Sequence, residues 1–309
     1  MTKHFCLLIL SLLITTPAAS KPLRIVASIK PIHSLVAGIT QGVAEPQLLI
    51  TSNQSPHNYS LRPSERRMLA DADLFFWIGP SMETFMPRIL NSLENRNKAI
   101  SLIQTEGLKL LAMRQAHHDD DHDHNDHIKM DAHIWLNTHN VDTLIDAIAD
   151  KLINFDPEHR QQYTANSKRL HDQVAQLRIG LQHSFVAVKT EFLTYHDGYQ
   201  YFENEFGLNN AGFIASSELQ PGARRISELK KQIKEKNIAC VFYDAPAEPS
   251  VLKSLLSGSK AKSFMLDPVG IFIPPGNNLW FELINSHSKQ FINCQQLNNS
   301  LLNAPRQAV

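Results

Sequence analysis

The chain has 309 residues, of which 43% are hydrophobic and 19% charged, a composition that excludes disordered and collagen-like classes. Its 30 Lys plus Arg balance 30 Asp plus Glu, so charge gives no reason to expect nucleic acid or an anionic membrane as partner. A chain of this length usually divides into two domains. Two counts stand out: an odd number of cysteines, three, and 15 histidines.

The first 20 residues are typical of a secretory signal peptide. Lys3 and His4 precede an apolar run at residues 5–14, and the small residues 18–20 follow it. The run is too short to cross a bilayer, which takes ~20 residues, and a buried first strand or helix is the weaker alternative. We therefore expect cleavage near Ser20, export, and a soluble mature protein.

The cysteine count becomes even once the leader is removed. Cys6 lies within residues 1–20, which leaves Cys240 and Cys294 in an oxidising compartment. A pair in that setting predicts a disulfide, although two buried free thiols are an alternative. The closed loop of ~55 residues would stabilise the fold by about 4 kcal/mol in the chain-entropy model.

Short β-rich runs alternate with helical stretches from residue 21 onward. Strands are predicted at residues 23–28, 47–50, 74–78 and 99–103, and helices at 31–41, 63–72 and 83–95. Two of these helices begin with Pro, which suits a first helical turn. The alternation predicts a parallel sheet covered by helices. We assign residues 21–155 to this N-terminal α/β lobe.

The middle of the chain has a different pattern. Helices are predicted at residues 141–153 and from Pro157 to about residue 189. Apolar residues recur along one face of the second helix: Tyr163, Leu170, Val174, Leu177 and Leu181. A helix of that length would span ~45 Å. We predict a long rigid connecting helix at residues 156–189, the alternative being a core helix of one lobe.

The first pattern then repeats over residues 190–309. Strands are predicted at residues 192–196, 211–214, 239–243 and 262–266, and helices at 199–206, 223–236, 249–257 and 277–291. The fold class predicted for the whole chain is α/β. Two lobes, each with a parallel β-sheet flanked by helices, are joined by the long helix.

Residues 117–127, HHDDDHDHNDH, contain five His and five Asp and no apolar side chain. Such a segment cannot build a core and is predicted to be a mobile loop. Imidazoles and carboxylates both bind divalent transition metals. The accessory ligands that we predict are His117, His118, His122, His124 and His127. A solvated acidic loop without a role is the alternative.

Outside that segment, three histidines lie where strands and helices meet loops. His57 follows a predicted strand, His133 precedes a predicted helix, and His196 ends the first strand of the second lobe. Asp267 ends another strand. Since ligands bind beyond the carboxyl ends of strands in open α/β sheets, these side chains could share a cleft. Three imidazoles plus a carboxylate or a water form a plausible tetrahedral zinc shell, but the spacing alone is a weak signal.

Longer motifs add a resemblance to a known family. The motifs are SIKPIHSLVAGI, PHNYSLRPSERRMLADADLFFWIGPSMETFM, DAHIWL, YHDGYQYFENEFGL, ELQPGARRISELK and ACVFYDAP. They resemble the periplasmic zinc-binding proteins of ABC importers, the ZnuA branch of the cluster-A metal solute-binding family. They occur in the family's order over nearly the whole mature chain. The resemblance implies a metal between the lobes, bound by His57, His133 and His196, and the cysteine pair also resembles the disulfide of some zinc members.

The resemblance also implies a function without catalysis. A monomeric carrier would capture Zn²⁺ as its cargo and deliver it to an ABC permease in the inner membrane, with no role for nucleic acid. Manganese members place a carboxylate where His196 stands, so a third imidazole favours zinc. Some members have a Glu beside the first histidine, where this chain has Pro56. The fourth ligand is therefore predicted to be Asp267 or a water.

Three other functions remain open from the sequence. One is a manganese or iron carrier of the same family. Another is a zinc-dependent hydrolase, since three His and an open position also suit catalysis. No convincing general base lies beside the cluster in the sequence, which weighs against that alternative. The third is a zinc buffer or adhesin that works without a permease.

Overall fold

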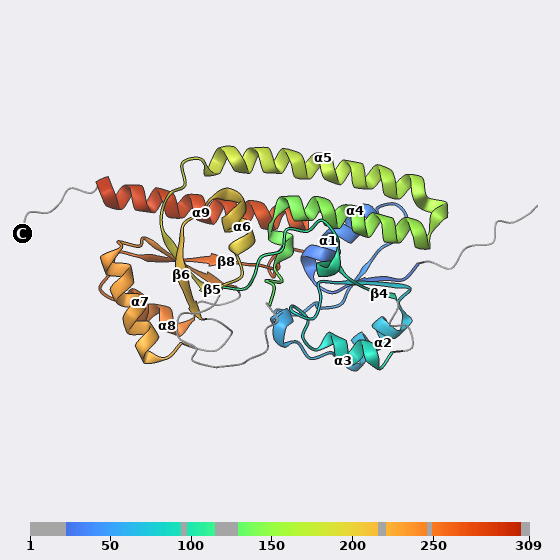
Figure 1. Ribbon diagram of the computed structural model, residues 1–309, viewed down its shortest axis with the longest axis horizontal. Helices are drawn as coiled ribbons and strands as arrows, with labels where there is room; N and C mark the ends of the chain where they lie inside the picture. The colour runs from blue at the N-terminus through green and yellow to red at the C-terminus, as the bar shows by residue number, and fades with distance from the viewer. Residues whose placement is uncertain (1–22, 94–97, 115–128, 216–220, 246–248, 304–309) are drawn as a thin grey trace, which may run out of the picture.

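The computed structural model describes residues 23–93, 98–114, 129–215, 221–245 and 249–303. The predicted signal peptide and the His/Asp-rich segment at residues 117–127 lie outside these ranges. The described chain forms two α/β lobes side by side, each built on its own sheet (Figure 1).

The first lobe contains a four-stranded parallel sheet in the order β2-β1-β3-β4. Its strands are β1 (Ile25–Ala27), β2 (Gln47–Leu48), β3 (Leu74–Trp77) and β4 (Ala99–Ser101). Helices α1 (Lys30–Ile39) and α4 (Thr138–Phe155) lie on one side of this sheet, and α2 (Pro63–Asp71) and α3 (Met86–Asn91) on the other (Figure 1). Strand β3 is buried along its whole length, which explains its continuous apolar sequence.

The second lobe repeats this plan, with parallel strands in the order β6-β5-β7-β8. Its strands are β5 (Phe192–His196), β6 (Asn210–Ala215), β7 (Cys240–Asp244) and β8 (Lys262–Leu266). Helices α7 (Ala223–Glu235) and α8 (Ser250–Leu256) cover one face, and α6 (Gln200–Phe206) and α9 (Leu279–Asn303) the other (Figure 1). The predicted class of two parallel α/β lobes is confirmed.

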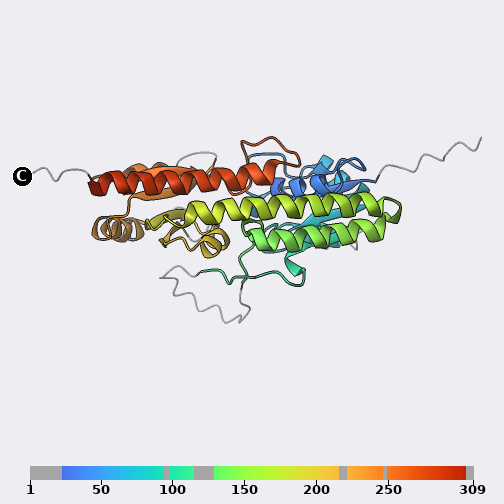
Figure 2. The ribbon, with the colours of Figure 1, turned by 90° about the horizontal axis from the view of Figure 1, so that it is seen from above.

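Two long helices run across the top of both sheets. Helix α5 (Arg160–Phe185), preceded by a 3-10 turn at Pro157–His159, extends from one lobe to the other (Figure 2). Helix α9 begins against α1 of the first lobe and continues along the second. It ends at Asn303, twelve residues beyond the predicted end. Neither these helices nor any other in the described ranges has the length and apolar character of a bilayer span.

One apolar core connects the lobes beneath these helices. It includes Ile32 from α1, Leu170 from α5, Phe192 from β5 and Phe291 from α9, all almost fully buried. A smaller cluster lies between the second sheet and α7 and α8. Because the larger core passes under both long helices, the apolar face of α5 belongs to a shared core as well as to a connection between the lobes.

The predicted disulfide is present. Cys240, the first residue of β7, is bonded to Cys294 in α9, with 5.9 Å between the two Cα atoms. The bond joins α9 to the sheet on which it packs. It closes a loop of 54 residues in sequence separation, which corresponds to about 4 kcal/mol of stabilisation in the chain-entropy model.

Candidate metal centre

The carboxyl ends of both sheets converge on three histidines. His57 lies in the 3-10 turn Pro56–Asn58 that follows β2. The side-chain oxygen of Ser55 accepts a hydrogen bond from the His57 backbone N–H at 3.3 Å, and the His57 carbonyl accepts one from Thr84 Oγ1 at 2.8 Å. These bonds fix the backbone on both sides of the ring, which suits a turn that presents one side chain to the cleft.

His133 precedes the short 3-10 helix Ile134–Leu136 and is oriented by Asp131. One oxygen of Asp131 accepts from the His133 backbone N–H at 2.9 Å and lies 2.7 Å from the ring Nδ1. Since a carboxylate only accepts, Nδ1 carries the proton, and Nε2 keeps its lone pair for a metal. Burial alone would raise the pKa of Asp131, but its interactions with His133 lower it.

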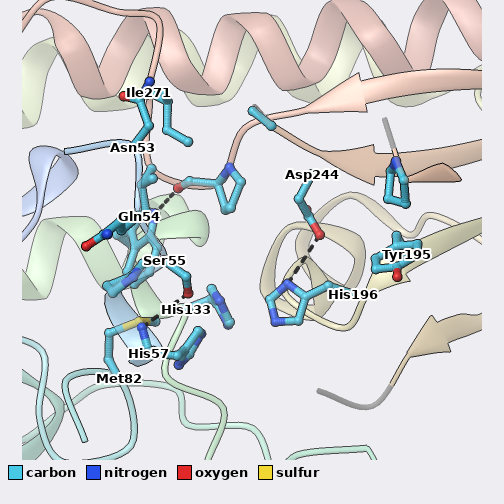
Figure 3. Close-up of a pocket in the computed structure, with 16 residues that line it drawn as sticks. Asn53, Gln54, Ser55, His57, Met82, His133, Tyr195, His196, Asp244 and Ile271 are labelled. Atoms are coloured by element: carbon cyan, nitrogen blue, oxygen red, sulfur yellow. Dashed lines mark hydrogen bonds and ion pairs between the residues drawn. The ribbon is translucent and has the colours of Figure 1, made fainter. Parts of the chain in front are cut away.

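His196 is the last residue of β5, and Asp244 is the last residue of the neighbouring strand β7. Asp244 Oδ2 lies 3.7 Å from His196 Nδ1 (Figure 3). The Tyr199 hydroxyl donates to the other oxygen of Asp244. Strands β5 and β7 are the pair at which the chain order of the sheet reverses. His196 therefore lies where ligands bind in open α/β sheets.

The three imidazoles form a cluster of metal-binding size. One nitrogen from each of His57, His133 and His196 lies within 4.8 Å of the others, and the ring centroids are 5.1–5.9 Å apart. Zn–N bonds of about 2.0–2.1 Å in a tetrahedron put ligand nitrogens ~3.3 Å apart. Ring movements on the order of 1 Å would close the cluster around an ion. A cavity of about 240 Å³ adjoins the rings. Figure 3 shows the side chains that line it.

Two of these imidazoles have lowered pKa values, which keep the rings neutral and able to bind a cation. Burial, together with the two neighbouring histidines, lowers the pKa of His57 to about 3. Burial also lowers the pKa of His196 from its ordinary value. Both rings are therefore neutral at neutral pH, the state that a metal ligand needs.

The structure does not bring Asp267 to the histidines. Its carboxylate accepts hydrogen bonds from the backbone N–H groups of Val269 at 3.3 Å, Gly270 at 2.7 Å and Phe272 at 3.4 Å. The side chain therefore caps the loop after β8. Among the described residues, the group that could share an ion consists of the three histidines alone. The other prediction, a water in the fourth position, stays a prediction.

Two carboxylates beside the site were not singled out from the sequence. Asp131 stands two residues before His133 within DAHIWL, so its short spacing was a visible signal. Asp244 ends β7 at the place where His196 ends β5, and that equivalence requires the strand order to be known. The accessory histidines His117 to His127 fall outside the described residues.

Replacing Asp131 by asparagine is expected to weaken zinc binding by roughly 10- to 100-fold, as loss of an outer-shell partner typically does. The amide can donate to Nδ1 and so favour the wrong tautomer of His133, while the shape of the side chain is kept. Competition with a chelator of known affinity measures the change. Asp172→Asn, at an exposed pair with Lys168, is the control. Equal zinc affinity in the Asp131 variant would contradict the assigned role.

The fully buried carboxyl of Glu83 predicts a pH effect on stability. Burial raises the pKa of Glu83 from 4.5 to about 7, and its oxygens accept from the backbone N–H groups of Ile78 and Gly79. The fold therefore favours the protonated form. This contribution is fully present below pH 4.5 and is lost as the pH rises through about 7.

At about 1.4 kcal/mol per pKa unit, the free energy of unfolding should fall by roughly 3 kcal/mol between pH 4 and pH 8 on account of Glu83. Chemical denaturation of the metal-free protein at several pH values measures this slope. Glu83→Gln should remove this part of the slope because it does not titrate. The same slope in the variant and the unaltered protein would rule out the effect.

Comparison with known proteins agrees with the geometry. The family described as zinc-uptake complex component A, periplasmic (ZnuA), matches residues 25–294. The high-affinity zinc uptake system protein ZnuA of Brucella abortus (strain 2308) is 35% identical over 303 residues, covering 87% of this chain and 91% of that protein. A crystal structure of ZnuA has a TM-score of 0.77 at 22% identity, covering 89% of this chain and 100% of the other.

The fold by itself does not choose the metal. The solute-binding protein FpvC from Pseudomonas aeruginosa, solved in complex with Mn²⁺, has a TM-score of 0.78 at 20% identity and covers 89% of this chain and 99% of its own. The family match identifies a solute-binding protein, a component of transport systems. The chain belongs to the periplasmic zinc-uptake component A family, ZnuA.

Proposed function

We propose that this protein captures Zn²⁺ in the periplasm through His57, His133 and His196 and delivers it to the permease of an ABC importer for zinc uptake. The observation that carries the proposal is the convergence of three imidazoles from both lobes beside a cavity. Membership of the family supports periplasmic capture and delivery. Zn²⁺ is the cargo in this proposal, with a water as its fourth ligand.

The donor set favours zinc over manganese or iron. All three clustered side chains offer nitrogen, and Mn²⁺ prefers carboxylate and other oxygen ligands. Mature protein offered Zn²⁺ and Mn²⁺ at equal concentration should retain zinc at one ion per site after gel filtration. Measurement of bound metal by mass spectrometry tests this. Retention of manganese in preference to zinc would favour the alternative carrier.

The protein acts as a carrier and not as a hydrolase in this proposal. The carboxylates beside the cluster are already engaged, Asp131 with His133, Asp197 with Arg114 and Asp244 with Tyr199, which weighs against their activating a water. Ester and peptide probes should remain intact when the zinc-loaded protein is added. Cleavage that depends on zinc would support the hydrolase.

Delivery is tested in cells. A strain that lacks this protein should grow poorly at limiting zinc, and the unaltered gene should restore growth while a gene encoding His196→Ala should not.

We propose that the exported protein begins near residue 21 and is a monomer without affinity for nucleic acid. Sequencing of the mature N-terminus and light scattering test the first two points. In the growth test, restoration of growth by the His196 variant would contradict zinc delivery through this site. A zinc buffer or adhesin would act without any dependence on the permease.

The segment at residues 117–127 is proposed to gather ions for the same cargo. Its five histidines and five aspartates supply ligands at high density. Deleting residues 117–127 should lower the number of zinc ions bound per chain and impair growth at limiting zinc. Unchanged values for both would leave the segment without this role.

A further inference from the structure

Arg114 connects the chain before the His/Asp-rich segment to two carboxylates of the second lobe. Arg114 Nε lies 2.9 and 3.0 Å from the two carboxylate oxygens of Asp197, and a terminal nitrogen of Arg114 also contacts this carboxylate. The other terminal nitrogen donates to Glu203 Oε2 in α6 at 2.8 Å. The side chains of Asp197 and Glu203 are only 10% and 5% exposed. One planar guanidinium thus binds two buried carboxylates in fixed geometry.

The first of these carboxylates belongs to the turn that holds a proposed zinc ligand. Asp197 directly follows His196, and Gly198 comes next. A Cβ atom on Gly198 would lie 2.6 Å from Cε1 and 2.8 Å from Nδ1 of His196, and 3.2 Å from Nε2 of His133. The backbone of this turn therefore packs directly against both imidazoles. Whatever fixes Asp197 also fixes the backbone on which the His196 ring lies.

Two chain segments that flank the His/Asp-rich residues lie on α6. Residues Ala112 and Met130 form an antiparallel bridge between them. Gln200 of α6 donates to the Ala112 carbonyl at 3.0 Å, and the Tyr201 hydroxyl donates to the Asp131 carbonyl at 2.9 Å. The second segment continues through Asp131 to His133. Arg114 ends the described part of the first segment and closes this set of contacts onto Asp197.

A small pocket confirms how close these groups are. Arg114, Asp131 and Asp197 line a cavity of about 50 Å³ together with the three histidines. Its walls come from the flanking segments on one side and from the His196 turn on the other. A shift in the position of Arg114 would therefore also shift the imidazoles that line the same pocket.

We propose that Arg114 is a positioning residue of the zinc site: its fork to Asp197 and Glu203 fixes the turn that orients His196 relative to His133. The residue contacts no metal and acts through the carboxylates. This inference rests on the zinc site proposed above. It also makes the chain just before the His/Asp-rich segment part of the same structural unit as the site.

The test replaces Arg114 by lysine, which keeps the charge and removes the planar fork. Zinc affinity should fall at least 10-fold, the lower end for loss of an outer-shell partner. The fall should appear in the rate at which a chelator removes zinc, with the association rate unchanged. Cobalt-loaded protein should show an altered visible absorption band, because the geometry of the ligands around the ion changes.

Arg178→Lys is the matched control. Arg178 binds Thr138 and Asp142 through a similar fork at helices α4 and α5, with 15% of its side chain exposed. It should lose thermal stability without losing zinc affinity. Equal losses of affinity in the two variants would show a general effect of destabilisation and would overturn the proposal.

A second variant keeps the test decisive if Arg114→Lys folds poorly. Asp197→Asn should weaken zinc binding to a similar degree, and the double variant should bind no more weakly than the worse single variant, since both break one fork. Additive losses, or wild-type affinity in either single variant, would overturn the positioning role. Weak zinc binding by the unaltered protein would refute the proposed function itself. Failure of the positioning role alone would leave tight zinc binding in the unaltered protein, so the two failures can be told apart.

Discussion

Alanine in place of His196 is expected to weaken zinc binding by a factor on the order of 100 or more. Zinc sites in small proteins contribute ~10–16 kcal/mol, so one of four ligands carries ~2.5–4 kcal/mol, and 1.4 kcal/mol corresponds to tenfold. The loss should be large because the ring supplies one of the three nitrogens of the cluster, and Asp244 is held in place through Oδ1 by the Tyr199 hydroxyl. Titration of the mature protein against a competing chelator gives the affinity, and the number of ions bound follows from the same titration.

His171→Ala is the control for this experiment. His171 lies on α5, with its nitrogens 2.9 Å from Asp142 and 2.8 Å from Asp146, and is not part of the metal cluster. Its loss should alter stability and leave zinc affinity unchanged. If His196→Ala retained tight binding, the principal zinc site would lie elsewhere in the chain, and the His/Asp-rich segment would be the first place to look.

Gly198→Ala is expected to weaken zinc binding about as strongly, although it removes no ligand. The added methyl group would lie 2.6 Å from Cε1 of His196, a separation that real Cβ atoms do not show, and 3.2 Å from Nε2 of His133. At least one ring must move, and a tetrahedral ion tolerates little change in nitrogen position. Isothermal titration with zinc at pH 7 measures the loss. The expected decrease is on the order of 100-fold, because one nitrogen ligand is displaced.

The control is Gly180→Ala in α5, where a new Cβ meets no atom within 4 Å. Alanine in a helix interior should stabilise the protein by ~0.5–1 kcal/mol and leave zinc affinity unchanged. If Gly198→Ala bound zinc as tightly as the unaltered protein, the turn would be able to yield, and the close approach would have no bearing on the site.

Much of the fold could be predicted because strands and helices differ in sequence period and in their first residues. Pro63 opens a helix as predicted, and the strand predicted at residues 74–78 forms at Leu74–Trp77, where it is fully buried. The end of α9 could not be predicted, because the polar residues after Phe291 resemble the end of a helix. Cys294 and the partly buried Leu297 and Leu301 extend its packed face to the last turns.

The site was less predictable than the fold, since its geometry depends on loops from distant parts of the chain. Family motifs pointed to His57, His133 and His196, but local spacing gave no reason to prefer Asp244 over Asp267. Both carboxylates end strands of the second sheet. They differ in the backbone N–H groups available to them. The loop after β8 offers several to Asp267, so these donors compete with a metal for its carboxylate, and only the three-dimensional structure shows this.

The core shared by the two lobes restricts the ways in which the protein can release its cargo. A wide hinge opening would expose Leu170, Phe192 and Phe291 to water, at about 25 cal/mol for each square ångström of apolar surface. Trp280 would also lose its bonds to Ser34 and to the Trp135 carbonyl. The barrier to zinc dissociation should therefore lie in local displacement of the ligand-bearing turns. A transport partner can lower that barrier by pulling on one turn, without separating the lobes.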